Sequence, residues 1–147
     1  MIAIASDHGG LELKKAVIRH LGAKGLEVKD FGTDSAESCD YPDFAGPAAE
    51  AVAAGEAEKG IVICTTGIGV SITANKIPGI RCALCHDVTT ARLTRLHNDA
   101  NVLAIGAGVI GENVAMDVVD TFLETAFSEE ERHKRRIAKI AEYEKKR

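Results

Sequence analysis

The stretch from Lys59 to Lys76 concentrates the residue types that could do chemistry in this chain. A short run of isoleucine and valine ends at Cys64, and an amphipathic segment later leads to Lys76. Between them lies a loop of hydroxyl and glycine residues: Thr65, Thr66, Gly67 and Gly69. This pattern predicts a buried strand, a tight turn and a helix. The turn would aim several backbone N–H groups at one point, and the helix start would add a positive partial charge there.

A turn of this kind has two chemical uses. Its N–H groups can bind an anion, and a thiol placed beside them loses its proton more readily than a free cysteine. Cys64 could therefore serve as a base. The alternative is that Cys64 is a buried residue at a strand end, because cysteine packs as a small hydrophobe. A single motif of this length leaves both interpretations open.

The elements that must position this loop follow from the hydrophobic pattern. Apolar runs predict five strands, at residues 1–5, 26–30, 59–64, 80–85 and 101–105. Further helices are predicted at residues 13–24, from near Pro47 to Gly55 after a polar loop, at 87–96, along an inner face of Val114, Val118 and Phe122, and after a capping box at 128–131. Alternating strands and helices predict a three-layer α/β/α sandwich, Rossmann-like, with a five-stranded parallel sheet.

The totals narrow the class of protein. With 147 residues and neither a linker nor a repeat, the chain is expected to form one domain, residues 1–147. The net charge of −4 argues against a broad surface for nucleic acid or for an anionic membrane. The sequence shows no secretory signal and no run of the ~18–20 apolar residues that span a membrane. We therefore expect a cytoplasmic protein with its four cysteines reduced.

Ligands bind at the carboxyl ends of the strands in such a sheet. The candidates that fall there are Asp7 and His8, Cys64 and Thr66, His86 and Asp87, and Gly106 and Gly108. His97 and Asn98 instead fall at the other end of the fourth helix, near the opposite edge of the sheet. A two-fold partner could bring these two residues to the site more easily than the same subunit could.

The candidates also have structural interpretations. Asp7 and His8 together could bind a sugar hydroxyl or a phosphate. Alternatively, Ser6 or Asp7 is a helix N-cap, although a cap does not explain His8. His97 near a helix C-terminus, followed by Asn98 in a left-handed turn, would form a cap that also holds a catalytic imidazole still.

Arg132 and Arg136 lie one helical turn apart, so they could grip one phosphate together. Alternatively, they are solvated charges that balance the acidic residues 129–131. The five histidines are dispersed, and no spacing indicates a metal site.

Two other motifs are weak. Cys82, Cys85 and His86 match a haem-attachment pattern, but residues three apart in a strand point to opposite faces, so we interpret the two thiols as core residues. The glycines at 106, 108 and 111 match a dinucleotide fingerprint, yet no later strand can carry the acidic residue that would hold a ribose. A dinucleotide-dependent enzyme remains a minor alternative.

Taken together, the motifs resemble those of the type B ribose-5-phosphate isomerase and galactose-6-phosphate isomerase family. The resemblance covers nearly the whole chain. It rests on Ser6-Asp7-His8-Gly9-Gly10, Asp40-Tyr41-Pro42, residues 63–69, Ala74-Asn75-Lys76, Pro78-Gly79-Ile80-Arg81, residues 97–103, and Arg132-His133 with Arg136. Several ordered motifs over one length are far more specific than any single one.

The resemblance implies an aldose–ketose isomerase that interconverts ribose 5-phosphate and ribulose 5-phosphate through an enediolate, as in the pentose phosphate pathway. It implies no metal and no cofactor. It also implies a homodimer or a dimer of dimers whose active sites lie between subunits, with the C-terminal helix (about 129–146) packing on a partner subunit. Galactose 6-phosphate, allose 6-phosphate or an unphosphorylated aldose are alternative substrates. A non-catalytic module that binds a sugar phosphate or a nucleotide is the alternative from another class.

The resemblance also implies roles for individual residues. Cys64 moves the proton between C2 and C1, and Thr66 with the amides of Gly67, Ile68 and Gly69 stabilises the enediolate oxygen. The remaining roles are ring opening by His97 with help from Asp7, a hydrogen bond from Asn98 to the developing charge, phosphate binding by His8, Arg132 and Arg136, and lining of the sugar pocket by Tyr41.

Two positions depart from the family pattern. Thr65 stands where the family usually has glycine, and Gly108 stands where it usually has an arginine that reaches the phosphate. We therefore expect weaker phosphate binding or a shifted substrate preference. One branch of the family uses a glutamate base near position 70, but Val70 cannot act in this way, which leaves the role to Cys64.

Overall fold

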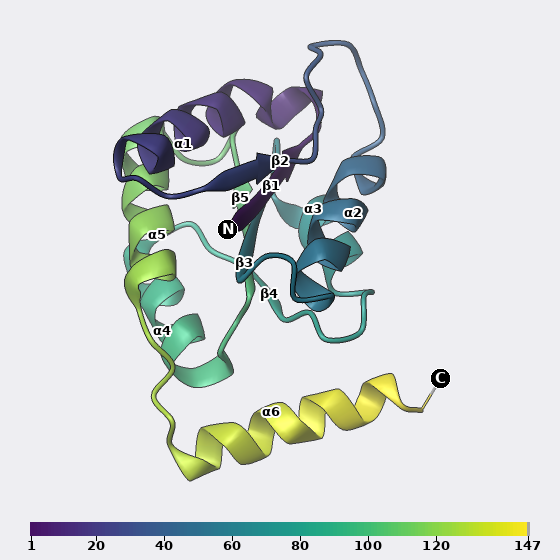
Figure 1. The fold of residues 1–147 in the computed structure, drawn as a ribbon, viewed down its shortest axis with the longest axis vertical. Coiled ribbons are helices and arrows are strands. Elements are labelled where there is room, and N and C mark those ends of the chain that lie inside the picture. The colour runs from purple at the N-terminus through teal and green to yellow at the C-terminus, as the bar shows by residue number, and fades with distance from the viewer. Residues whose placement is uncertain (147) are drawn as a thin grey trace.

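Five parallel strands form the centre of the computed structural model, which describes residues 1–146 (Figure 1). They lie in the order β2–β1–β3–β5–β4. Their bounds are β1 Ile2–Ser6, β2 Val28–Asp30, β3 Lys59–Cys64, β4 Cys82–Leu84 and β5 Val102–Gly106. The prediction of a five-stranded parallel sheet is confirmed, and each predicted strand lies within two residues of an observed one at both ends.

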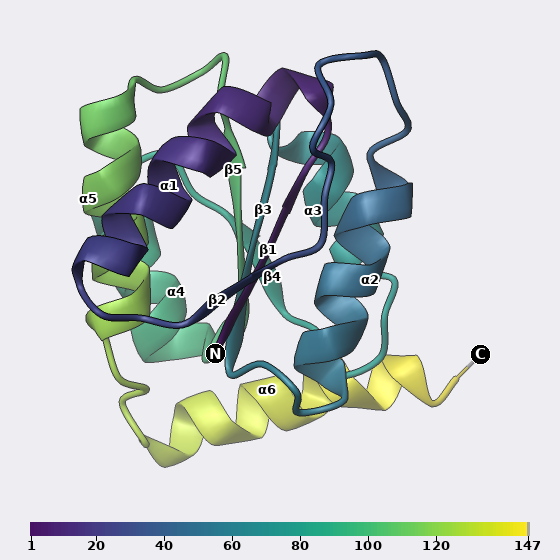
Figure 2. The same cartoon turned by 45° about the horizontal axis from the view of Figure 1, so that its top comes forward.

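Helices cover both faces of the sheet (Figures 1 and 2). One layer contains α1 Leu11–Ala23, α4 Val88–Asn98 and α5 Glu112–Glu124, and the other contains α2 Pro42–Ala53 and α3 Ile68–Ala74. A short turn of 3₁₀ helix, η1 His8–Gly10, leads into α1. The last helix, α6 Glu131–Glu144, crosses beyond the amino-terminal edge of the sheet instead of covering a face (Figure 1). No helix within residues 1–146 has the length and apolarity needed to cross a bilayer.

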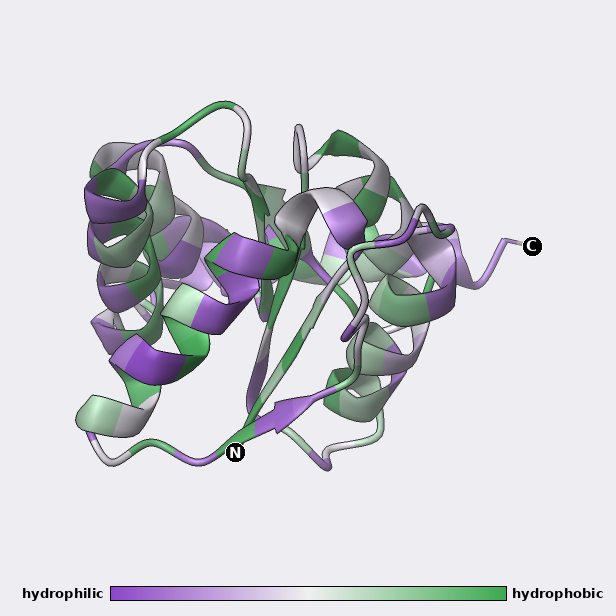
Figure 3. Ribbon diagram, turned by 90° about the horizontal axis from the view of Figure 1, so that it is seen from above, coloured by the Kyte–Doolittle hydropathy of each residue, from purple (hydrophilic) through white to green (hydrophobic). Residues whose placement is uncertain are grey.

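Two apolar clusters form the core, one on each face of the sheet (Figure 3). Successive residues of β3 alternate between them: Ile61 and Ile63 face the layer of α1, α4 and α5, whereas Val62 and Cys64 face α2 and α3. This alternation is the reason why the central strands read as continuous apolar runs, because helices bury them on both sides. It also determines that the side chain of Cys64 projects from the face of the sheet that α2 and α3 cover.

Three predicted helix features are wrong. α2 begins at Pro42, well before Pro47, which lies inside the helix. The helix tolerates it because the missing N–H would have bonded only the carbonyl of Asp43, which is exposed and can bond water. On α5, Val114 is 44% exposed, and Ala115, Val118, Val119 and Phe122 form the buried face instead.

The third wrong feature is the capping box at 128–131. α6 begins at Glu131, and the side chain of its N-cap residue, Glu130, makes no capping hydrogen bond. The hydroxyl of Ser128 instead accepts a hydrogen bond from the Glu130 N–H and lies 2.7 Å from Nδ1 of His133. Ser128 therefore ties the start of α6 to a histidine.

Candidate active site

The turn after β3 holds the thiol of Cys64 against a backbone donor. Gly67 adopts a left-handed conformation with φ of 76°, and its N–H donates to Sγ of Cys64 at 3.1 Å. A Cβ at Gly67 would lie 2.8 Å from the carbonyl carbon of Ile105, so only glycine lets the turn approach β5 this closely. The N–H of Ile68 donates to Oγ1 of Thr66 at 3.2 Å.

A hollow of about 430 Å³ opens beside this turn. Its lining includes six of the predicted site residues: Asp7, Tyr41, Cys64, Thr66, Ile68 and Gly69. Thr65 and Ile72 complete the lining. Tyr41 reaches the hollow because position 69 is glycine: a Cβ there would lie 2.5 Å from Cζ of the tyrosine ring. The structure thus joins residues from the ends of β1 and β3 with the start of α2.

Asp7 combines its two interpretations. Its carboxylate accepts a hydrogen bond from the N–H of Gly10 at 3.1 Å, and the same buried residue lines the hollow. His8 is exposed, and its Nδ1 accepts a hydrogen bond from the N–H of Cys39 at 3.2 Å. This contact ties His8 to the loop that precedes α2, at the same edge of the sheet as Cys64.

His97 and Asn98 lie at the opposite edge, at the end of α4, and neither lines the hollow beside Cys64. Oδ1 of Asn98 accepts a hydrogen bond from the Thr94 hydroxyl at 3.1 Å, which leaves the amide nitrogen as the donor at the surface. The predicted left-handed turn at Asn98 is wrong, because Asp99 takes that conformation with φ of 44°. The Asp99 carboxylate is stabilised there by an ion pair with Arg95 at 2.8 Å.

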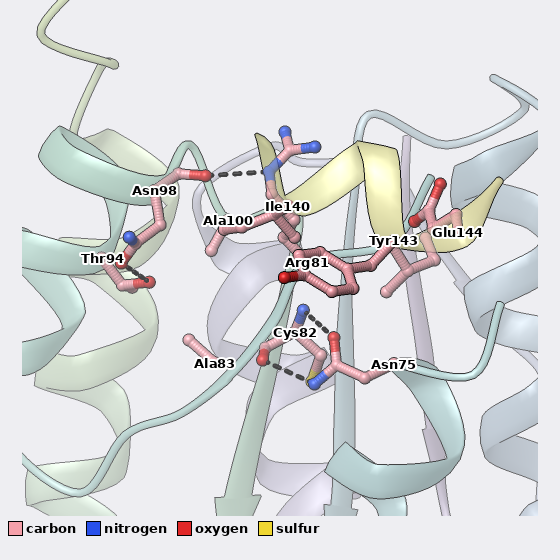
Figure 4. Close-up of a pocket in the computed structure, with 11 residues that line it drawn as sticks. Asn75, Arg81, Cys82, Ala83, Thr94, Asn98, Ala100, Ile140, Tyr143 and Glu144 are labelled. Carbon is pink, nitrogen blue, oxygen red and sulfur yellow. Dashed lines mark hydrogen bonds between the residues drawn. The ribbon is translucent and has the colours of Figure 1, made fainter. Parts of the chain in front are cut away.

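A second cavity, of about 510 Å³, lies beside Asn98 (Figure 4). Figure 4 shows Ile140, Tyr143 and Glu144 of α6 facing Arg81 and Asn75 across it. Nε of Arg81 donates to the Asn98 carbonyl at 2.8 Å, and the Asn75 side chain exchanges two hydrogen bonds with the backbone of Cys82. Arg81 and Asn75 were recognised in the sequence only as parts of family motifs, and this cavity was not predicted.

The two arginines of α6 also lie away from the hollow. Arg132 and Arg136 are exposed, and Arg132 pairs with Glu130 at 3.2 Å. Burial lowers the pKa of His133, and the positive charges of Arg132 and Arg136 lower it further. Within one chain, the predicted phosphate ligands are therefore divided between His8 at one edge and Arg132 with Arg136 at the other.

The weak motifs have structural explanations. Cys82 packs against the cluster of α2 and α3 whereas Cys85 belongs to the cluster on the other face, and burial raises the pKa of both thiols. Nε2 of His86 accepts a hydrogen bond from the Gly106 N–H at 3.2 Å. A Cβ at Gly106 would lie 2.6 Å from the carbonyl of Thr66, so this glycine serves contact with the Cys64 turn.

In the part of the chain that the structure describes, no three histidine, cysteine or carboxylate side chains are grouped as metal ligands would be. The chemistry on view is a thiol with a backbone donor, hydroxyls and a carboxylate around one hollow. Such a set suits proton transfer next to a carbonyl group.

Comparisons with known proteins place this chain in a family. Residues 2–140 match the model of the Ribose/Galactose Isomerase family. Ribose-5-phosphate isomerase B of Escherichia coli is 46% identical over 99% of this chain and 97% of its own. The structure of ribose-5-phosphate isomerase B from Clostridium thermocellum superposes with a TM-score of 0.97 and 54% identity, over 99% of this chain and 97% of that one. The enzyme of the same name from Mycoplasma genitalium, solved with bound ribulose-5-phosphate, superposes with a TM-score of 0.95 and 42% identity. The match covers 99% of this chain and 97% of that one. This chain therefore belongs to the ribose/galactose isomerase family.

Proposed function

We propose that this protein is an aldose–ketose isomerase that interconverts ribose 5-phosphate and ribulose 5-phosphate, with Cys64 as the base. The observation that carries the proposal is the placement of Cys64: its thiol lines a hollow and receives a backbone hydrogen bond at 3.1 Å. The relatives named as ribose-5-phosphate isomerase B, one of them with bound ribulose-5-phosphate, indicate which substrate to expect.

The reaction needs a base at carbon and donors at oxygen. A proton next to a carbonyl is weakly acidic, so the negative charge that gathers on the oxygen must be stabilised as the proton leaves. The Cys64 thiolate takes the proton from C2 and returns it to C1. The Thr66 hydroxyl and the backbone N–H of Gly69 stabilise the enediolate oxygen, whereas the N–H groups of Gly67 and Ile68 hold the Cys64 thiol and the Thr66 hydroxyl in place.

The other half of the site comes from a second copy of the chain. Ring opening by His97 and a hydrogen bond from Asn98 require these residues near Cys64, and in one chain they lie at opposite edges of the sheet. A two-fold interface would join each Cys64 hollow to the partner's end of α4. It would also bring His8, Arg132 and Arg136 around one phosphate, while Asp7 assists ring opening.

Exposed apolar residues on both half-sites support this homodimer. Ile68 and Ile72 beside the hollow are 51% and 56% exposed, and Ile140 and Tyr143 on α6 are 50% and 71% exposed. Burial of such side chains against a partner is favourable. We infer that α6 packs on the partner subunit of a dimer, or of a dimer of dimers.

Gly108 favours a second candidate within the same class. No arginine extends from this position toward a phosphate, so a six-carbon sugar phosphate such as galactose 6-phosphate or allose 6-phosphate, or an unphosphorylated aldose, is the runner-up substrate.

The four cysteines are unpaired, and a thiolate base requires a reduced thiol. This supports a place in the cytoplasm. The proposed reaction itself would belong to pentose phosphate metabolism.

The decisive experiment follows formation of ribulose 5-phosphate from ribose 5-phosphate by the native protein and by Cys64→Ala. We expect turnover by the native protein that disappears in the variant. Cys85→Ala is the matched control, because it removes an equal side chain from the core and should keep most of the activity. Absence of turnover with both five- and six-carbon sugars would leave the non-catalytic binding module as the better interpretation.

A further inference from the structure

Three successive residues at the end of α4 contact the segment from Thr125 to His133, which leads into α6 and includes its first turn. Nε of Arg95 donates to the Thr125 carbonyl at 3.0 Å, and the Ser128 N–H donates to the Leu96 carbonyl at 3.3 Å. The ring of His97, the next residue, lies against the ring of His133, with centroids 4.6 Å apart and planes tilted by 38°. Residues 95–97 are therefore each attached to the same neighbouring segment.

His133 is much more buried than His97. Its side chain is 6% exposed, whereas His97 is exposed. Nδ1 of His133 lies 2.7 Å from the Ser128 hydroxyl and 3.2 Å from the Glu130 carboxylate, and the Phe127 ring lies 6.4 Å from it, centroid to centroid. The sequence singled out this histidine only as part of a basic cluster.

We infer that His133 is a positioning residue for His97: its buried ring holds the exposed imidazole of His97 in one orientation for ring opening in the partner's hollow. This inference rests on the proposed function. A histidine at the exposed end of a helix otherwise samples several rotamers. An acid–base group must lie within hydrogen-bond reach of the sugar oxygen, so one fixed rotamer raises the fraction of productive complexes.

Binding of phosphate by His133 is the competing role, and its burial disfavours that role. A phosphate ligand must reach solvent in the unliganded protein, as Arg132 and Arg136 do. His133 instead directs Nδ1 into the contact with Ser128 and one face toward His97. The two roles predict different kinetics, because ring opening concerns only one of the two substrates whereas both carry the phosphate.

The test compares two reactions of His133→Ala and His133→Phe. The first is conversion of cyclic ribose 5-phosphate to ribulose 5-phosphate. The second is incorporation of solvent deuterium at C1 of ribulose 5-phosphate, followed by NMR. Ribulose 5-phosphate is open-chain because its C5 oxygen carries the phosphate, so exchange requires Cys64 and no ring opening.

For His133→Ala we expect conversion to fall about 10- to 100-fold, a loss typical of a misplaced catalytic group, while exchange stays near the native rate. His133→Phe keeps a ring against His97 and should retain most of the conversion. Ser128→Ala, which frees the His133 ring without removing it, should show a smaller loss confined to conversion. Arg135→Ala, an exposed neighbour on α6, is the control.

Equal loss of both reactions in His133→Ala, with an increased KM, would identify a phosphate ligand and overturn the inference. So would unchanged conversion in both His133→Ala and Ser128→Ala. If His133→Ala does not fold, Ser128→Ala and His133→Phe decide the question alone. A native protein that catalyses neither reaction would count against the proposed function itself, which separates the two failures.

Discussion

Thr65 and Gly108 occupy one shared space beside the Cys64 turn. The Gly108 N–H donates to the Thr65 carbonyl at 2.8 Å, and a Cβ at Gly108 would lie 2.9 Å from Cγ2 of Thr65. The Thr65 hydroxyl also lies close to Gly9, where an added Cβ would be 2.3 Å from Oγ1 of Thr65. The two departures from the family pattern are therefore coupled, because the threonine side chain stands where a side chain at 108 would begin.

This contact predicts that Gly108→Arg alone will not restore a phosphate ligand. Overpacking against Thr65 should destabilise the fold by about 1–3 kcal/mol and displace the Cys64 turn. The double variant Thr65→Gly with Gly108→Arg removes the obstacle, so we expect it to bind ribose 5-phosphate with a lower KM than the native protein. Steady-state kinetics of the single and double variants check this. Equal KM values for the native protein and the double variant would show that the arginine is not needed.

Gly67→Ala should damage stability and catalysis together. The left-handed φ of 76° strains alanine, and the Cβ would lie 2.8 Å from the Ile105 backbone, so the turn must move and carry its N–H away from Cys64. We expect a loss of about 1–3 kcal/mol in the free energy of unfolding and a drop in kcat. Urea denaturation and kinetics measure the two effects.

Gly25→Ala is the matched control for Gly67→Ala. Gly25 has nearly the same conformation, with φ of 79°, but open space around it. It should lose part of the stability and none of the kcat. A similar drop in kcat for both variants would mean that general destabilisation, and not the Cys64 turn, limits the reaction.

The shared site predicts rescue by subunit mixing. Cys64→Ala and His97→Ala should each be nearly inactive. A heterodimer of the two carries one site with both substitutions and one site with neither, so random mixing should restore about a quarter of the native activity. Unfolding and refolding the two variants together, followed by the ribose 5-phosphate assay, tests this. No recovery from verified heterodimers would place Cys64 and His97 in the same subunit's site.

The sequence predicts the sheet well because β3 and β5 are apolar on both faces, and that pattern has few alternatives in a chain of this length. It also predicts Cys64 with its turn, since Gly67 has to be glycine for the turn to form. Contacts of the segment after α5 were not predictable. His133 meets His97 because the loop at 125–130 folds back onto α4, and nothing local in either segment encodes that return.

Ser128 shows a different limit, within one short segment. Its spacing to Glu131 satisfies the capping-box pattern, yet its hydroxyl serves Glu130 and His133 instead. A capping-box pattern records only the spacing of two residues, and here a nearby N–H and a histidine ring take the same hydroxyl. Pro47 shows the reverse case, because the pattern placed a helix start at a proline that the helix interior tolerates.

The buried His133 also predicts a pH-dependent stability. Burial lowers its pKa below the ordinary 6.5, and the positive charges of His97, Arg132 and Arg136 lower it further, while Glu130 opposes them. As the pH falls below about 6.5, the unfolded chain binds this proton before the folded one does, so the free energy of unfolding should decrease. Urea denaturation at fixed protein concentration, at pH 7.5 and 5.5, measures the decrease. His133→Phe cannot take up the proton, so its stability should depend less steeply on pH over this range. An equally steep dependence in the variant would assign the effect to other groups and would leave His133 protonated with little cost.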